Sequence, residues 1–364
     1  MGIKIISNFK SGNLCNVEIE KNDNFDIIKF APSPKGGPES LWFYFKVIHN
    51  GRKKIKIILK HFYNTLGAKF PPLIRPVIKK DGEWQRLPEP EIEMFPDGRY
   101  SIFWIISPPL RNFEIAFCYP YGIEELEKLI KESEGYWKKD IIGISMNNRP
   151  LIRLSNNYGN KKLSGIYLIA RQHSGETPGS WVLDGFLRYF AKIKTDKILV
   201  WAIPLSNIDG IEEGYYGKDN FPYDLYNAWG TPPMRHEILV FQRDIYRWIE
   251  RCKPILGIDF HAPGGCETEG IYFNLKNRDK KTIEWIEKIS SEVDKKYISD
   301  EYKKFSIWKE RWQTPTFSEF FINILKIPGI LIEIPYTYSK NHILEINDYL
   351  RIGEEIAKGI IKNI

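Results

Sequence analysis

The chain has 364 residues and a formal net charge of +7, from 53 lysines and arginines against 46 aspartates and glutamates. This length leaves room for one large or two ordinary domains with real hydrophobic cores, and no stretch is long and apolar enough to cross a bilayer. The basic residues are spread along the chain instead of forming a stripe interleaved with aromatics, so we expect neither a nucleic-acid partner nor a membrane.

The beginning of the chain, Met1–Ser7, lacks the apolar stretch and the small-residue cleavage site of a secretory signal. The four cysteines, Cys15, Cys118, Cys252 and Cys266, follow no pairing rhythm. We therefore expect the cysteines to be reduced thiols and not disulfides. Because reduced thiols are the rule in the cytoplasm, we predict a cytoplasmic protein. The sequence carries no signal of an oligomeric state.

Residues 1–118 are predicted to form an all-β sandwich domain. Their apolar segments are short, rich in β-branched and aromatic residues, and separated by turn signals such as Asn50-Gly51 and Asp97-Gly98. The large rings of Leu41–Val47 and Arg99–Trp104 would pack between two sheets. The expected strands are Phe25–Phe30, Leu41–His49, Ile55–Phe62, Arg99–Ile106 and Phe113–Cys118.

Residues 119–364 are predicted to form a second domain of the α/β class. After Tyr119–Gly122, apolar strands alternate with amphipathic runs, a pattern typical of a largely parallel sheet with helices packed on it. The expected helices are Ile123–Glu134, Ser180–Ile193, about Arg235–Lys253, Lys281–Tyr297 and Glu345–Lys362. The expected strands are Gly165–Ala170, Ile198–Pro204, Ile255–His261 and Gly329–Pro335.

The turn after the strand Gly165–Ala170 carries the first candidate ligands. His173 and Glu176 lie three positions apart between this strand and the next predicted helix. The carboxyl ends of strands are where ligands bind in open α/β sheets, and an imidazole and a carboxylate at this spacing reach one metal ion. A His-x-x-acidic pair alone is weak evidence, because such pairs arise often by chance.

Two further strands end in polar side chains. Ile255–His261 ends in Asp259 and His261, and Gly329–Pro335 carries Glu333 inside an apolar run. A buried charge costs several kcal/mol unless it is paired. Glu333 is therefore either salt-bridged or faces a wet, metal-containing cleft. Two close ligands followed by a distant third are the usual layout of a catalytic zinc site.

These segments together resemble the zinc carboxypeptidases of the carboxypeptidase A type, nearest to the cytosolic carboxypeptidase branch. His173–Glu176 with Gly179–Trp181 is similar to that branch's HPGE…SW signature, and Ile203–Gly210 to its PxxNPDG segment. Asp259–His261 and Ile332–Ile334 are similar to the strands that carry its third zinc ligand and its catalytic glutamate. The resemblance covers nearly the whole chain. It implies the family's α/β fold, a mixed sheet flanked by helices, here preceded by the all-β sandwich.

The resemblance also implies roles for particular residues. His173, Glu176 and His261 would hold one Zn²⁺, and Asp224 would hydrogen-bond the first zinc histidine. Glu333 would act as general base toward a zinc-activated water and then pass the proton to the leaving amine. The implied function is that of a zinc-dependent metallopeptidase acting on a peptide or amide bond.

The chain departs from the family where the substrate is held. Tyr226 and Asn227 replace the Asn-Arg pair that grips a terminal carboxylate, and the oxyanion arginine falls on Gly217. We predict that Lys218 takes over that catalytic role and that Tyr226, Asn227 and Arg235 bind substrate. Losing a bidentate guanidinium weakens carboxylate recognition. The remaining candidate cations are Arg243 and Arg311.

Two alternatives follow from these replacements. The protein could be a zinc amidohydrolase or deacylase whose substrate has no free terminal carboxylate. It could also be a catalytically degenerate binding protein, although the retained ligands, base and outer aspartate oppose that hypothesis.

Overall fold

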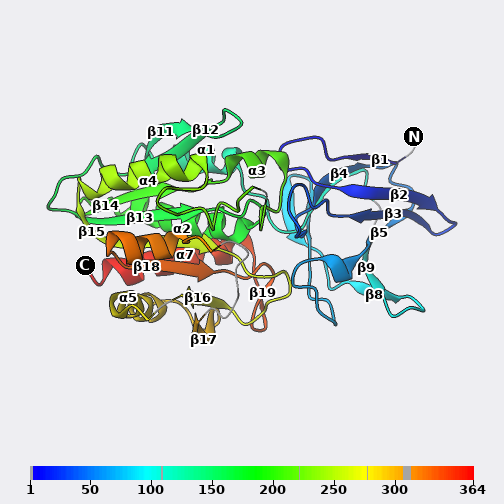
Figure 1. The fold of residues 1–364 in the computed structure, drawn as a ribbon. Coiled ribbons are helices and arrows are strands. Elements are labelled where there is room, and N and C mark those ends of the chain that lie inside the picture. Colours follow the sequence, from blue (N-terminus) through cyan, green and yellow to red (C-terminus); the bar gives the residue numbers. More distant parts are fainter. Residues whose placement is uncertain (1–2, 108–109, 221, 277, 306–312) are drawn as a thin grey trace.

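A computed structural model describes residues 3–107, 110–220, 222–276, 278–305 and 313–364 (Figure 1). The first ten strands lie within residues 4–116 and form two five-stranded sheets. An eight-stranded sheet layered with helices follows, as expected for an α/β fold preceded by an all-β region. The boundary between domains 1–118 and 119–364 stays our proposal. Within the described ranges, no helix has both the length and the apolar character needed to cross a membrane.

The two N-terminal sheets have the strand orders β1-β4-β10-β6-β7 and β2-β3-β5-β9-β8. All neighbouring pairs are antiparallel except β3 and β5. Large rings fill the space between them: Phe30 lies 5.0 Å from Phe43 and 4.9 Å from Phe45, measured between ring centroids. The strands are β1 (Lys4–Ile6), β2 (Cys15–Lys21), β3 (Phe25–Ala31), β4 (Tyr44–Ile48), β5 (Lys54–Leu59), β6 (Val77–Lys80), β7 (Glu83–Arg86), β8 (Glu91–Met94), β9 (Tyr100–Ile106) and β10 (Asn112–Ala116), with a short 3-10 helix at Phe62–Asn64.

The large sheet has the strand order β11-β12-β14-β13-β15-β18-β16-β17. Its four central strands, β14, β13, β15 and β18, run parallel, whereas β11, β12 and β16 pair antiparallel with their inner neighbours. The central strands are almost wholly buried because helices cover both faces. The strands are β11 (Lys138–Ile144), β12 (Pro150–Ser155), β13 (Ser164–Ala170), β14 (Ile198–Ile203), β15 (Lys253–His261), β16 (Ile271–Leu275), β17 (Ile298–Phe305), β18 (Gly329–Glu333), β19 (Tyr338–Ser339) and β20 (His342–Ile343).

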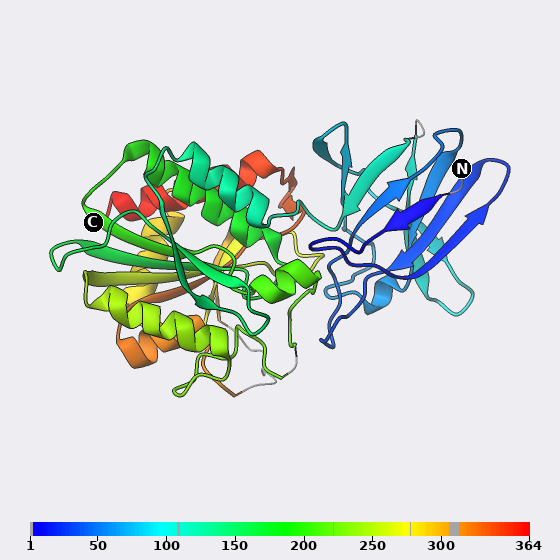
Figure 2. The same ribbon diagram turned by 90° about the horizontal axis from the view of Figure 1, so that it is seen from above.

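Helices α2 and α7 pack tightly together on one face of the sheet, and α4 lies on the other (Figure 2). The close approach requires two glycines: a Cβ at Gly185 would lie 2.0 Å from the Leu350 carbonyl oxygen, and one at Gly353 would lie 1.9 Å from that of Val182. The helices are α1 (Ile123–Glu132), α2 (Thr177–Ile193), α3 (Ile208–Glu213), α4 (His236–Ile249), α5 (Lys280–Ser290), α6 (Phe317–Glu319), which continues as a π-helix at Phe320–Leu325, and α7 (Ile346–Ile361).

The N-terminal sheets lie beside the carboxyl ends of the central parallel strands (Figures 1 and 2). Hydrogen bonds join the two parts. Asn13 Nδ2 donates to the Gly214 carbonyl at 2.7 Å, and Arg86 Nη2 donates to the Tyr336 carbonyl at 2.5 Å. The Arg86 guanidinium also lies over the Tyr119 ring. The all-β part therefore borders the sheet edge at which the polar strand ends emerge.

The predicted elements and the observed ones differ in ways that have physical reasons. Strands β2 and β8 were not predicted because they are sheet edges whose side chains are mostly exposed, so no buried face marks them. The buried segment Leu41–Phe43 precedes β4 instead of belonging to it. The expected helix Lys281–Tyr297 ends at Ser290. The largely parallel sheet proved to be parallel only at its centre and around β16 and β17.

Candidate metal centre

Three strand ends of the parallel sheet bring the predicted ligands together. Strand β13 ends at Ala170, and the turn that follows carries His173 and Glu176 into the start of α2. His261 is the last residue of β15. Because β15 and β18 pair in parallel with His261 opposite Glu333, the fourth predicted residue emerges at the same edge. The four side chains meet because apolar parallel strands end in polar residues at the same edge of the sheet.

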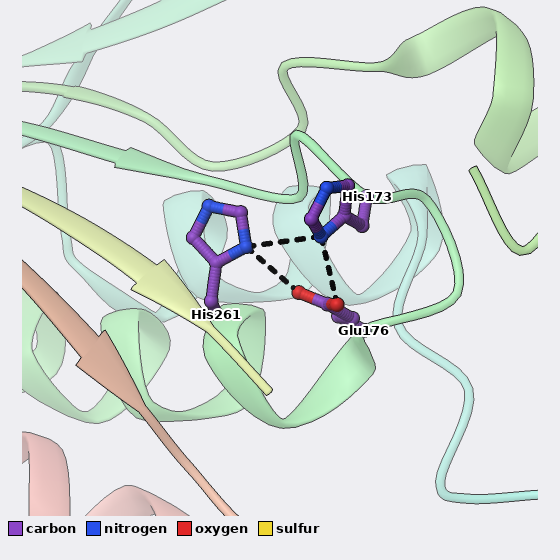
Figure 3. Close-up of side chains that lie close together, drawn as sticks. All are labelled: His173, Glu176 and His261. Carbon is purple, nitrogen blue, oxygen red and sulfur yellow. Dashed lines mark hydrogen bonds and ion pairs between the residues drawn. The ribbon is translucent and has the colours of Figure 1, made fainter. Parts of the chain in front are cut away.

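The side chains of His173, Glu176 and His261 point toward one another (Figure 3). His173 Nδ1 lies 2.8 Å from Glu176 Oε1, and His261 Nδ1 lies 2.9 Å from Glu176 Oε2. The two Nδ1 atoms are 3.2 Å apart. One candidate ligand atom from each residue lies within 4.8 Å of the other two, and all three residues are buried.

The donor set fits a metal ion. Each histidine has a carboxylate oxygen beside its Nε2, so in the neutral, metal-binding form of each ring Nε2 carries the hydrogen and the Nδ1 lone pair faces inward. Lone pairs that crowd together in this way repel each other unless a cation lies among them. The negative charges around the site also favour a positive charge at this position. Burial alone would lower the pKa of His173, but Asp224 and Glu176 raise it to about 9. The site is therefore one that can hold a metal ion.

Asp224 lies where the resemblance implies, against the first of the two histidines. Its Oδ2 is 3.0 Å from His173 Nε2. The backbone N–H groups of Asp219 and Tyr226 each donate to this carboxylate at 2.9 Å. Burial alone would raise the pKa of Asp224, but the charge and hydrogen bond of His173 hold it below its ordinary value. Outer carboxylates of this kind orient a ligating imidazole.

Asp259 is a hydrogen-bond partner of His261 for which the sequence motifs predicted no role. Its Oδ2 lies 3.0 Å from His261 Nε2, and its residue is fully buried. Burial raises the pKa of Asp259, and His261 opposes the rise. A signal was present in the sequence, because residues two apart on a strand point to the same face. A buried aspartate two places before a candidate ligand could have been assigned from that rule.

Glu333 lies at the end of β18 as a half-buried residue whose Oε2 is buried without a hydrogen-bond partner in the described part of the chain. Burial and the nearby Glu176 charge raise its pKa to about 7, and His261 and Lys218 oppose the rise. The salt-bridge hypothesis for Glu333 is not supported by the ion pairs of the described residues.

Lys218 is the predicted cation that reaches the cluster. Its Nζ lies 3.8 Å from Glu176 Oε1. Burial alone would lower the pKa of Lys218, but Tyr216, Glu176 and Glu333 raise it above its ordinary value, so the side chain stays cationic. Gly217, the position on which the resemblance places the oxyanion arginine, could not carry that side chain. Gly217 has φ +90°, and a Cβ there would lie 2.5 Å from Ser174 N.

The other predicted cations are placed differently. Arg235 donates from Nη1 to the Tyr223 carbonyl at 3.0 Å and pairs with Glu237 at 3.3 Å, so its guanidinium is engaged outside the ligand cluster. Arg243 is exposed on α4. Arg311 lies outside the described residues.

Tyr226 and Asn227 lie differently with respect to the ligands. The Tyr226 ring centroid is 5.3 Å from that of His173 and 4.9 Å from that of His261, so this ring covers one side of the cluster. Asn227 is buried, and within the described ranges its Oδ1 has no hydrogen-bond partner. Asn227 therefore presents an uncharged amide with an unpaired acceptor in the described part of the chain.

Comparison with known proteins supports the resemblance. No protein-family model matches the chain. Cytosolic carboxypeptidase 6 of Caenorhabditis elegans is 23% identical over 335 residues, which cover 82% of this chain and 72% of the worm protein. Cytosolic carboxypeptidase 6 of Mus musculus is 26% identical over 260 residues, 64% of this chain, and the matched part spans only 47% of the mouse protein.

The fold has solved counterparts along its whole length. The crystal structure of a metallo-carboxypeptidase from Burkholderia cenocepacia superposes with a TM-score of 0.79 at 16% identity, covering 100% of this chain and 98% of the bacterial one. The sequence relatives and the shared fold lead to the same assignment. Both support the zinc carboxypeptidase family of the carboxypeptidase A type, the family that the sequence motifs resemble.

Proposed function

We propose that this protein is a zinc-dependent hydrolase that cleaves a peptide or amide bond, with Glu333 as general base. The convergence of His173, Glu176 and His261 beside the register-paired Glu333 carries the proposal. Two imidazoles and a carboxylate are a donor set of catalytic zinc sites. When bound, zinc would polarise the scissile carbonyl and acidify a water molecule.

Glu333 performs the proton transfers in this proposal. Its carboxylate takes a proton from the attacking water and later donates it to the leaving amine. A pKa of about 7 suits both tasks, because a group that titrates near neutral pH is effective both as a base and as an acid. The buried, unpaired Oε2 is an acceptor available for that proton.

Lys218 stabilises the negative charge that develops on the carbonyl oxygen. Its ammonium is held next to Glu176 and stays cationic. Arg235 contributes to substrate binding only indirectly in this proposal. Its guanidinium holds the Tyr223 carbonyl and so fixes the position of Tyr223. Asp224 fixes the His173 ring through the hydrogen bond at Nε2.

Two observations bear on the class of substrate, and they favour different classes. The relatives are named carboxypeptidases, which favours a peptide with a free C-terminus. The uncharged Tyr226 and Asn227 favour an amide without a terminal carboxylate. We propose the peptide as first candidate and the uncharged amide as second. Four free cysteines support the proposed cytoplasmic location.

A metal assay combined with a substrate panel tests the function. Purified protein is expected to carry about one Zn²⁺ per chain, and removal of zinc by a chelator is expected to abolish hydrolysis reversibly. The panel contains peptides with a free C-terminus, the same peptides amidated at the C-terminus, and N-acyl amino acids. Cleavage restricted to free C-termini identifies a carboxypeptidase, and equal cleavage of the amidated peptides identifies the amidase. Zinc binding without cleavage of any of them identifies the degenerate binding protein.

Replacing Lys218 by methionine is expected to lower kcat/KM by about 10²–10³-fold, the usual cost of one oxyanion donor. The metal content should remain near wild type, because Lys218 is not a ligand. Lys280→Met on α5 is the control, since that side chain is 90% exposed. Equal activities of the Lys218 and Lys280 variants would contradict the oxyanion role.

A further inference from the structure

We propose that Trp229 acts as a positioning residue for the metal centre, setting the orientation and tautomer of His261 through Gln172 and Asp259. The inference rests on the metal site of the proposed function. It concerns a part of the molecule that does not touch the ligand atoms of that site.

A continuous chain of buried hydrogen bonds connects these residues. Trp229 Nε1 lies 2.6 Å from Gln172 Oε1, Gln172 Nε2 lies 2.5 Å from Asp259 Oδ2, and the same Oδ2 lies 3.0 Å from His261 Nε2. Trp229, Gln172 and Asp259 are fully buried, and His261 is 2% exposed. Water therefore does not compete for any of these three contacts.

Only one assignment of donors and acceptors is consistent with this series of hydrogen bonds. An indole nitrogen is a donor and never an acceptor, so the Gln172 oxygen must face Trp229 and the Gln172 NH₂ must face Asp259. Asp259 Oδ2 then accepts from Gln172 and from His261, which places the hydrogen of His261 on Nε2. The His261 Nδ1 lone pair is left facing His173 and Glu176, as a metal ligand requires.

Packing and backbone hydrogen bonds fix the position of Trp229, so its indole N–H can orient the other residues of the hydrogen-bond series. Its ring lies 5.0 Å from that of Phe317 and 5.6 Å from that of Phe320. Its backbone N–H donates to the Pro315 carbonyl at 3.1 Å, and Gln242 Nε2 lies 3.3 Å from its carbonyl oxygen. The indole N–H is therefore fixed by the hydrophobic core.

The two histidines differ in how they are anchored. At His173, Asp224 is held directly by backbone N–H groups of its own loop. At His261, the equivalent carboxylate depends on side chains, and its Oδ1 is buried without a partner in the described ranges. Trp229 lies three residues after Tyr226, so the loop over the metal centre also supplies the anchor of the third ligand.

The test compares Trp229→Phe with Trp248→Phe. Trp248 is a matched control because it is fully buried, packs on Tyr167 and Phe321, and has an indole nitrogen without a partner in the described residues. Trp229→Phe is expected to weaken Zn²⁺ binding by about tenfold, the lower end of the effect of losing a direct outer-shell partner, because Trp229 acts through Gln172 and Asp259. Trp248→Phe should stay within about twofold of wild type, as measured by competition with a chromophoric chelator.

A spectroscopic measurement separates positioning from loss of structure. ¹⁵N-histidine NMR of the zinc-loaded protein should show a slowly exchanging, hydrogen-bonded His261 Nε2–H in wild type and in Trp248→Phe, and a rapidly exchanging one in Trp229→Phe. Gln172→Met breaks the same chain at its next link and serves if Trp229→Phe does not fold. Wild-type zinc affinity together with an unchanged His261 signal in the folded variants would overturn the inference. Failure of wild type to bind zinc would instead overturn the proposed function.

Discussion

Glu333→Gln is expected to lower kcat by about 10²–10⁴-fold while the protein keeps its full zinc content, because the amide cannot accept a proton. The residue lies opposite His261 in the β15–β18 register and is not one of the three converging ligands. Metal analysis and steady-state kinetics on the same preparation measure both effects. A Glu333→Gln enzyme with wild-type kcat would eliminate Glu333 as the base.

The pH profile gives this prediction a second readout. Burial and the Glu176 charge raise the pKa of Glu333 to about 7, and a base must be ionised to act. We therefore expect kcat/KM in wild type to fall about tenfold per pH unit below the pKa of the base. The residual activity of Glu333→Gln should lack this acidic limb.

The same raised pKa has a consequence for stability with a defined sign. A carboxyl whose pKa is higher in the folded than in the unfolded chain stabilises the fold at low pH, and this contribution is lost as pH rises through the folded value. The metal-free wild type should therefore lose stability relative to Glu333→Gln between about pH 4 and pH 7. Denaturant unfolding across that range measures the difference.

Glu267→Gln is the matched control for these experiments. Glu267 accepts from the Tyr272 hydroxyl at 3.1 Å, and its charge raises the pKa of Glu333. Its removal should leave kcat near wild type above pH 8 and shift the acidic limb to lower pH. A limb that stays in place in the Glu267 variant would show that another group controls it.

His261→Ala is expected to reduce zinc affinity by at least about a hundredfold. Structural zinc sites with four ligands bind with roughly 10–16 kcal/mol, which is about 3 kcal/mol for each ligand. The loss also leaves two buried carboxylates, Glu176 and Asp259, without their shared histidine. Activity should fall to that of chelator-treated wild type, and a large excess of zinc should restore only part of it.

His236→Ala is the control for the loss of a histidine. His236 is exposed at the first turn of α4, away from the converging ligands. This variant should bind about one zinc ion with wild-type affinity. If His261→Ala bound zinc as tightly as His236→Ala, the ion would be held elsewhere and the assignment of the metal centre would be wrong.

Hydrophobic patterning predicted that the candidate ligands lie at one sheet edge, and the resemblance to the zinc carboxypeptidases supplied their roles. The strands that precede His173 and that end in His261 and Glu333 are continuous apolar runs, and the carboxyl ends of parallel strands meet at one sheet edge. The all-β front of the chain was predicted for a similar reason, since alternating aromatic strands bury one face. These features depend on local periodicity, which a single sequence displays.

Features that depend on contacts between distant segments were decided only by the tertiary structure. Lys218 approaches Glu176 because Gly217 takes a left-handed conformation against Ser174, and Arg235 is drawn away by Tyr223 and Glu237. Gln172, Trp229 and Asp259 meet in the core although 87 positions separate the first from the last. Strand register, backbone conformation and the demand of buried polar atoms for partners determine such contacts, and no local pattern of residues records them.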